Sequence, residues 1–306
     1  MIEGDPALTG TWEKPGKSLI AAAVSLVLIA GSLYFAAGSI VMLPVALVMM
    51  APDTSWAAGG GFREIIERYY SRLQVPILTV TSLAQFVILL ALTLFLVRHW
   101  HTRRIGAYFG YRAPPAVDLA LAAAGAIAMV PLAGLLSAWY YHFFPVLRQI
   151  SRASSLLLSA RSPGQAALVV FAIAVTPAIC EEALFRGYFL RTLSRRMSPM
   201  AAITLSGVVF ALYHRSPLGL LSLVLAGVYL GFVYQRTGSL YVSMTCHFLY
   251  NLTIIALTNL RGSAFLLAED VDRKSLLVAA AATVVLAAGV VLIAVRGAAR
   301  GRGAIR

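Results

Sequence analysis

The chain has 306 residues, of which 60% are hydrophobic and only 12% are charged. Because about a quarter of the residues in an average soluble domain are charged, this composition excludes an ordinary soluble globular protein. A net charge of +13 is also found in nucleic-acid-binding proteins, but here the basic residues are spread among the loops between apolar segments, which argues against a nucleic-acid surface.

Eight apolar segments predict membrane-spanning helices. In chain order they are residues 18–50, 75–97, 116–139, 164–185, 199–213, 217–234, 239–258 and 275–295. Several exceed the roughly 20 residues that a helix needs to cross a bilayer. The first is longer than the apolar region of a signal peptide, so we expect it to be retained. Because lipid offers no hydrogen-bond partners to the backbone, we predict an all-α, polytopic membrane bundle of about eight transmembrane helices.

The distribution of basic residues predicts the orientation of the bundle. If both termini are cytoplasmic, most of the 25 Lys and Arg residues fall in segments that face the cytoplasm. This bias follows the positive-inside rule. We therefore expect a multi-pass integral protein of the cell inner membrane, in contact with lipid, with both termini in the cytoplasm.

Two adjacent carboxylates, Glu181 and Glu182, are the acids that lie well inside a predicted span. Charged groups there cost at least ~2.5 kcal/mol each on insertion scales, so they normally face the bundle interior and have partners. Arg186 follows Glu182 by four residues and shares its helical face, whereas Glu181 is rotated by one step. One carboxylate can thus be neutralised locally while the other stays available. A purely structural cluster is the alternative interpretation of this stretch.

Further polar residues occur in two other spans. His214 directly follows the segment 199–213. His247 and Asn251 stand four residues apart, on one helical face. A break between residues 197 and 198 separates the two helices. Glu181 lies as many residues before this break as His214 lies after it, so an antiparallel hairpin brings both residues to one level. We therefore predict one site between three helices, in the cytoplasmic half of the bilayer.

Three stretches of the sequence resemble the signatures of a known family. "EEALFRG", "FALYH" and "TGSLYVSMTCHFLYN" are similar to the EExxxR, FxxxH and HxxxN motifs of the CPBP (Abi) intramembrane proteases, whose members include the CAAX prenyl proteases of the Rce1 type and bacteriocin-immunity proteins. The resemblance covers about residues 164–257. It divides the chain into N-terminal helices of unassigned function (1–163), a catalytic core (164–257), and a final transmembrane helix with a basic tail (258–306).

The resemblance implies a helical bundle that hydrolyses peptide bonds. It implies that Glu181 is the general base that activates water, assisted by His214, and that His247 and Asn251 stabilise the tetrahedral oxyanion. Hydrogen-bond donors aimed at a developing oxyanion gain strength where water is scarce, which agrees with these roles. For Glu182 and Arg186 it implies a supporting role that holds the first motif in place.

The cofactor is left open by the sequence. In the metal-free scheme the protein residues act alone. In the alternative, Glu181, His214 and His247 hold a divalent metal such as zinc and leave one position for water, as catalytic zinc sites do. The HExxH spacing of many zinc proteases is absent.

Three functions remain separate hypotheses. The first is a glutamate-type intramembrane endopeptidase that acts on a peptide or protein substrate, prenylated or not. The second is a non-catalytic member of the family, acting as an immunity factor or scaffold. The third is a proton-coupled transporter, which would also place Glu and His in its spans but would be expected to show inverted repeats with broken helices, and these are not visible in the sequence.

Overall fold

The computed structural model describes residues 8–50, 62–214, 219–261 and 273–303. Within these ranges the chain is helical and contains no strand, which confirms the all-α prediction. In chain order the helices are η1 (Thr11–Glu13), α1 (Leu19–Met50), α2 (Phe62–Ala84), η3 (Gln85–Leu92), α3 (Thr93–Trp100), α4 (Ile105–Phe109), α5 (Ala116–Phe143), α6 (Pro145–Ser154), η4 (Ser155–Leu158), α7 (Pro163–Val169), η5 (Val170–Val175), α8 (Thr176–Glu182), η6 (Ala183–Leu190), α9 (Arg191–Ser194), α10 (Pro199–Tyr213), α11 (Leu220–Thr237), α12 (Leu240–Arg261) and α14 (Arg273–Gly303).

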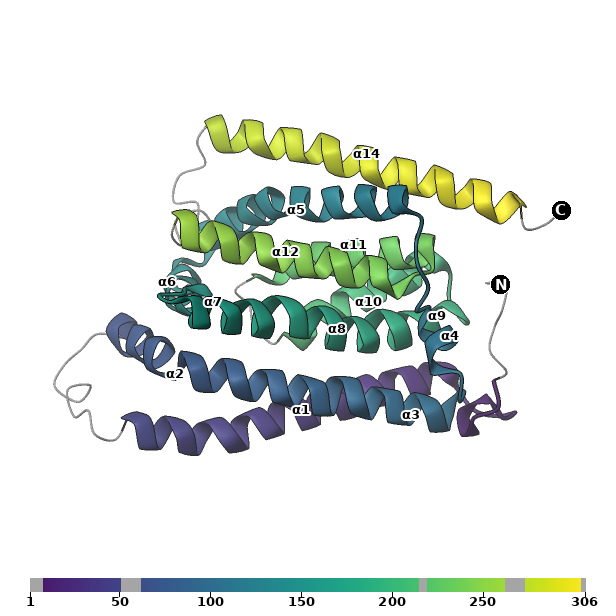
Figure 1. The fold of residues 1–306 in the computed structure, drawn as a ribbon, viewed down its shortest axis with the longest axis horizontal. Helices are drawn as coiled ribbons and strands as arrows, with labels where there is room; N and C mark the ends of the chain where they lie inside the picture. The colour runs from purple at the N-terminus through teal and green to yellow at the C-terminus, as the bar shows by residue number, and fades with distance from the viewer. Residues whose placement is uncertain (1–7, 51–61, 215–218, 262–272, 304–306) are drawn as a thin grey trace.

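Seven helical stretches of the described residues are long and apolar enough to cross a membrane. They are Leu19–Val45, Glu64–Trp100, Ala116–Phe143, Pro163–Ser194, Leu220–Thr237, Leu240–Leu260 and Arg273–Ala299. Helix α10, which corresponds to the fifth predicted span, is apolar but shorter than the others. Its place beside α11 in the middle of the bundle keeps it within the same layer of helices (Figure 1). The protein is thus a multi-pass integral membrane protein.

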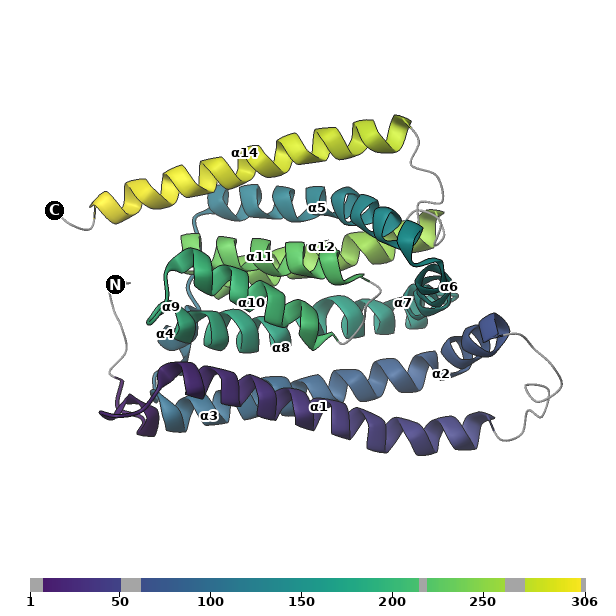
Figure 2. The same ribbon diagram turned by 180° about the vertical axis from the view of Figure 1, so that it is seen from behind.

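The helices lie side by side in layers, with their long axes roughly parallel. Helix α14 packs along α5 at one edge, α11 and α12 lie beneath α5, and α10 and the continuous helix α7–α9 follow (Figure 1). Helices α1, α2 and α3 form the opposite edge, and the reverse view shows α10 and α11 between the same two layers (Figure 2). The segment 163–261 is therefore covered on both sides by other helices of the chain.

Three π-helical segments interrupt the described helices. Segment η3 lies within the helix that runs from α2 to α3, while η5 and η6 flank α8 on either side. Such segments are rare and occur often at functional sites. Pro177 supplies a local cause for η5, because a proline has no N–H to donate to the carbonyl of Ile173, its α-helical partner. The helix that carries both glutamates is therefore irregular on both sides of the short α-helical segment in which they lie.

One hydrophobic core joins the N-terminal helices to the segment that carries the motifs. It brings together Leu26 of α1, Leu89 of η3, Phe185 of η6 and Phe210 of α10. Packing is thus continuous across position 163. The predicted division into three regions concerns function, and it stays a prediction.

Gly187 of η6 is a point of close approach between two elements of this core. A Cβ atom at this position would lie 1.9 Å from Cδ1 of the fully buried Phe109, at the end of α4. We expect Gly187→Ala to destabilise the protein by about 1–3 kcal/mol, since the ring must move within a packed core. The measurement is thermal unfolding of the purified protein in detergent.

Gly38→Ala is the matched control, because a Cβ at position 38 in α1 meets no atom within 4 Å. Alanine also favours the helical conformation relative to glycine. An unfolding temperature that falls equally in both variants would contradict the predicted contact between Gly187 and Phe109.

Candidate functional site

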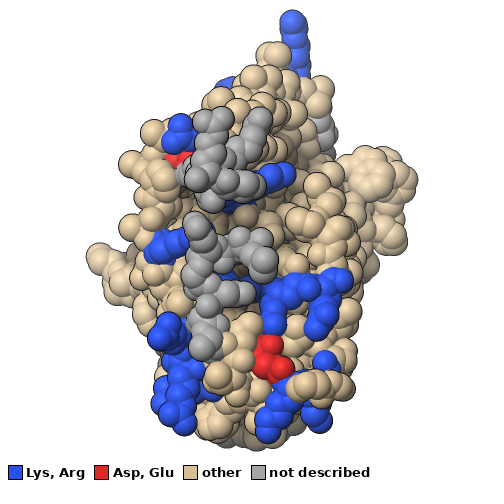
Figure 3. Space-filling model, turned by 90° about the vertical axis from the view of Figure 1, so that its right-hand side faces the viewer, with Lys and Arg blue, Asp and Glu red and all other residues tan. Residues whose placement is uncertain are grey.

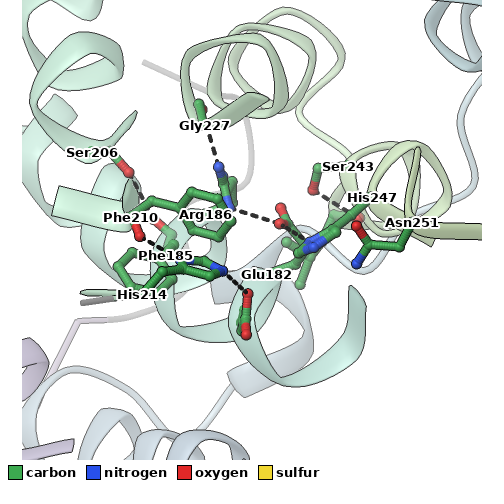
Figure 4. Close-up of polar contacts among 12 residues, drawn as sticks. Glu182, Phe185, Arg186, Ser206, Phe210, His214, Gly227, Ser243, His247 and Asn251 are labelled. Atoms are coloured by element: carbon green, nitrogen blue, oxygen red, sulfur yellow. Dashed lines mark hydrogen bonds and ion pairs between the residues drawn. The ribbon is translucent and has the colours of Figure 1, made fainter. Parts of the chain in front are cut away.

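The carboxylate of Glu182 is the centre of a fully buried polar cluster. Its Oε1 atom accepts hydrogen bonds from Nη1 of Arg186 at 2.7 Å and from Nδ1 of His247 at 2.8 Å (Figure 4). The side chains of Glu182 and Arg186 are both 0% exposed. The contact expected from the four-residue spacing of Glu182 and Arg186 is thus present, and His247 of α12 joins it from across the bundle.

Arg186 extends this cluster to two more helices. Its Nη2 atom donates to the carbonyl of Gly227 in α11 at 3.0 Å, and its guanidinium lies 4.4 Å from the ring centre of Phe210 in α10. Because burying an ion costs several kcal/mol unless it is paired and hydrogen-bonded, these contacts compensate both charges. The cluster fixes α8, α10, α11 and α12 relative to one another.

Glu181 has a different environment from its neighbour. Its Oε2 atom lies 3.9 Å from Nε2 of His214, which is beyond hydrogen-bond distance. Among the described residues this buried oxygen has no hydrogen-bond partner. The antiparallel hairpin therefore does bring Glu181 and His214 to one level, but it leaves a gap between their polar atoms.

The orientation of His214 is determined by its other ring nitrogen. Nδ1 lies 2.9 Å from the carbonyl oxygen of Phe210, and because a carbonyl only accepts, Nδ1 carries the hydrogen. In the neutral ring, Nε2 then presents a lone pair toward Glu181. Two acceptor atoms thus face each other across the gap, an arrangement suited to a molecule that donates two hydrogen bonds.

Phe210, the first residue of the "FALYH" stretch, contacts every cationic or imidazole side chain of the site. Its ring centre lies 4.8 Å from that of His214 and 5.9 Å from that of His247, in addition to the contact with Arg186. Phe185 packs edge-on against it at 5.2 Å. The ring separates the two imidazoles and holds their positions, a role that the sequence motif alone did not reveal.

Asn251 makes a contact that the sequence did not predict. Its Nδ2 atom donates to the carbonyl oxygen of Ile173 at 2.8 Å, the same carbonyl that lacks an α-helical donor because residue 177 is proline. The amide therefore ties α12 to η5. An asparagine amide has a second N–H, which remains for another acceptor.

The predicted set of metal ligands does not converge in this arrangement. His247 hydrogen-bonds Glu182 through Nδ1, whereas Glu181 faces His214. In the part of the chain that the structure describes, no group of three His, Cys, Asp or Glu side chains is placed to hold a metal ion. As placed, Glu181, His214 and His247 do not fit a three-ligand zinc site.

Polar side chains from the N-terminal half also surround Glu181. Tyr34 of α1 and Tyr213 of α10 lie within electrostatic reach of Glu181, and Gln85 of η3 is a neighbour of Tyr34. The rings of Tyr34 and Tyr213 stack with centres 6.1 Å apart. Gln85 is a polar residue inside an apolar span, so the sequence did contain a signal, but its partners on distant helices could not be read from it.

Comparisons with known proteins find a match to the segment that carries the three motifs. The sequence model of the family described as type II CAAX prenyl endopeptidase Rce1-like matches residues 163–253. No curated protein and no solved structure matches the chain. The matched segment runs from the start of α7 into α12 and contains all seven residues that the three motifs specify. The predicted resemblance is thus confirmed for residues 163–253, which are similar to the Rce1-like endopeptidases, a family of proteases.

Proposed function

We propose that the protein is an intramembrane endopeptidase in which Glu181 activates a water molecule held between its carboxylate and His214. The observation that carries this proposal is the pair of acceptors, Oε2 and Nε2, facing each other 3.9 Å apart at a largely buried position. A water at ordinary hydrogen-bond distances of about 2.8 Å from both atoms fits that spacing. Such a water donates both hydrogens and directs its lone pairs toward a substrate.

The reaction would proceed by general base catalysis. The water oxygen attacks the carbonyl carbon of the peptide bond while Glu181 takes the proton that the water loses. When the carbon–nitrogen bond breaks, this proton passes to the departing amine. His214 holds the second hydrogen of the water and so fixes the direction of attack.

His247 is suited to stabilise the oxyanion of the tetrahedral intermediate. Its Nδ1–H donates to the Glu182 carboxylate, which orients the ring, and in the imidazolium form the Nε2–H would donate to the oxyanion. In that form the positive charges of Arg186 and His247 balance the two glutamates. The second N–H of the Asn251 amide would also donate to the oxyanion, while its first N–H donates to the carbonyl of Ile173.

The substrate would be a membrane-associated peptide or protein, with or without a prenyl group. Helix α1 begins and α14 ends at the same end of the bundle (Figure 1), which supports an orientation with both termini in the cytoplasm of the cell. Under the positive-inside rule the end that carries both termini, which is basic, faces the cytoplasm. An inner-membrane location is part of the same proposal.

Adjacent substitutions should separate catalysis from stability. We expect Glu181→Gln to lower peptide hydrolysis by at least ~100-fold, because an amide cannot accept the proton, while thermal unfolding is unchanged. The assay uses a panel of quenched peptides, prenylated and unprenylated, with the purified protein in detergent. Wild-type activity in this variant would refute the proposal and favour a non-catalytic immunity factor or scaffold.

Glu182→Gln is the matched control, since it makes the same chemical change one residue away. The charge of Arg186 would lose its buried counter-ion, and breaking such a pair costs about 3–5 kcal/mol. We therefore expect a large drop in the unfolding temperature for Glu182→Gln alone. Equal stability of the two variants would show that Glu182 does not hold the cluster together.

For His247→Ala we expect kcat to fall by about 10²–10³-fold with little change in KM, because the lost hydrogen bond forms only in the transition state. Steady-state kinetics on the best peptide of the panel provide the measurement. A change confined to KM would instead place His247 in substrate binding.

The arrangement of the donor atoms also predicts that hydrolysis continues in the presence of a chelator. The measurement compares activity before and after incubation with a chelator, followed by addition of zinc. Activity that disappears and returns with zinc would establish the metal-dependent alternative with Glu181, His214 and His247 as ligands.

A further inference from the structure

A polar pocket lies at the end of the bundle where α1 begins and α3 ends, away from the site described above. It has a volume of about 660 Å³, and its lining includes Thr9, Thr11, Lys14, Arg98, His99 and Arg103. Lys and Arg side chains gather over this end of the molecule, with little Asp or Glu between them (Figure 3). The pocket is therefore a concave, strongly basic part of this face.

One wall of the pocket is the chain segment that precedes α1, and backbone contacts hold it in place. The N–H groups of Thr9 and Gly10 donate to the carbonyl of His101 at 3.0 and 2.9 Å. A Cβ atom at position 10 would lie 2.1 Å from the carbonyl carbon of Trp100, so the approach requires glycine. The wall is thus fixed against the end of α3.

A partly buried ion pair anchors the same segment from its other side. Glu13 accepts from both terminal nitrogens of Arg195 at 2.7 Å and from Nδ1 of His101 at 2.6 Å. Although burial acts to raise it, the pKa of Glu13 is held below its usual range by these hydrogen bonds. Its carboxylate is therefore fully engaged and cannot neutralise the pocket.

The cations of the pocket have no partner of opposite charge among the residues that the structure describes. Among the described residues, no carboxylate forms an ion pair with Lys14, Arg98 or Arg103. Three cations that pair with no described carboxylate surround one hollow beside the hydroxyls of Thr9 and Thr11, and they suit an anion with several acceptor oxygens. Arginine in particular matches the geometry of a phosphate group.

The position of the pocket along the bundle indicates which anions reach it. Lys14 and Arg98 flank the ends of two apolar spans, which begin at Leu19 and end at Trp100. The rings of Trp12 and Trp100 lie 5.5 Å apart at this level, and tryptophan is enriched at the membrane–water interface. The pocket is therefore at the depth of lipid headgroups, where basic pockets bind anionic lipids.

We infer that this pocket binds the phosphate group of an anionic phospholipid. The inference is independent of the proposed peptidase activity, because none of the residues involved contacts the glutamates or histidines of that site. Lipid binding would hold the segment before α1 and the end of α3 at the bilayer surface.

The test compares two neighbouring arginines in the full-length protein. Arg103 lines the pocket, whereas the exposed Arg104 does not, so Arg103→Gln and Arg104→Gln remove the same charge from the same face. Binding is measured by native mass spectrometry and thermal shift with phosphatidylglycerol, with phosphatidylcholine and with inorganic phosphate. We expect saturable phosphatidylglycerol binding that weakens about tenfold in Arg103→Gln and less than about twofold in Arg104→Gln.

Arg98→Gln provides an independent variant of the pocket should Arg103→Gln fail to fold, and it should weaken phosphatidylglycerol binding to a similar extent. Equal losses in Arg104→Gln and the pocket variants would overturn the inference, since they would indicate general attraction to the basic face. Binding of phosphatidylcholine as tight as that of phosphatidylglycerol would overturn it as well. If inorganic phosphate saturates the pocket and the lipid binds no more tightly, the lipid inference would be overturned and the ligand would be a soluble phosphate.

Discussion

The burial of the Glu182 carboxylate is the constraint on which the arrangement of the motifs depends. An ion at 0% exposure must be paired, and a single oxygen of Glu182 accepts from both Arg186 and His247. Because Arg186 also reaches α11, the requirement to compensate one charge sets the positions of several helices. The adjacent Glu181 is excluded from this network and faces His214 instead. Two chemically identical residues thus acquire different roles from their surroundings alone.

The π-helical segments give the bundle a second set of contacts, between side chains and backbone. The carbonyl of Ile173 in η5 accepts from Asn251, and the carbonyl of Phe185 in η6 accepts from Ser206 at 3.4 Å. In a regular helix such carbonyls are occupied within the helix, and lipid would not satisfy them if they were freed. Ser206 and Asn251 on neighbouring helices donate to these two carbonyls. The irregular helix around α8 therefore strengthens contacts between helices just where the two glutamates lie.

From the sequence we could predict the structural features that depend on short-range residue spacing and on bilayer thickness. Apolar runs located the spans, the four-residue spacing paired Glu182 with Arg186, and equal distances from a turn placed Glu181 beside His214. It did not predict that His247 would choose Glu182 rather than Glu181, because that choice depends on the register of α12 against an irregular helix. The neighbours of Glu181 on α1 and η3 were missed for the same reason: they follow from packing between helices far apart in the sequence.

The exposure of the site residues gives the proposed reaction a direction. The side chain of His214 is 29% exposed, those of Glu181 and His247 are 9% and 5% exposed, and that of Glu182 is 0% exposed. Water and a peptide would therefore approach from the side of His214, where α10 ends, and meet Glu181 before any other carboxylate. Behind Glu181, the charges of Glu182 and Arg186 are sealed from water, so they stay paired as the substrate enters. Access decreases from the reacting atoms toward the ion pair, which allows water to reach the base without competing for the hydrogen bonds that hold the bundle together.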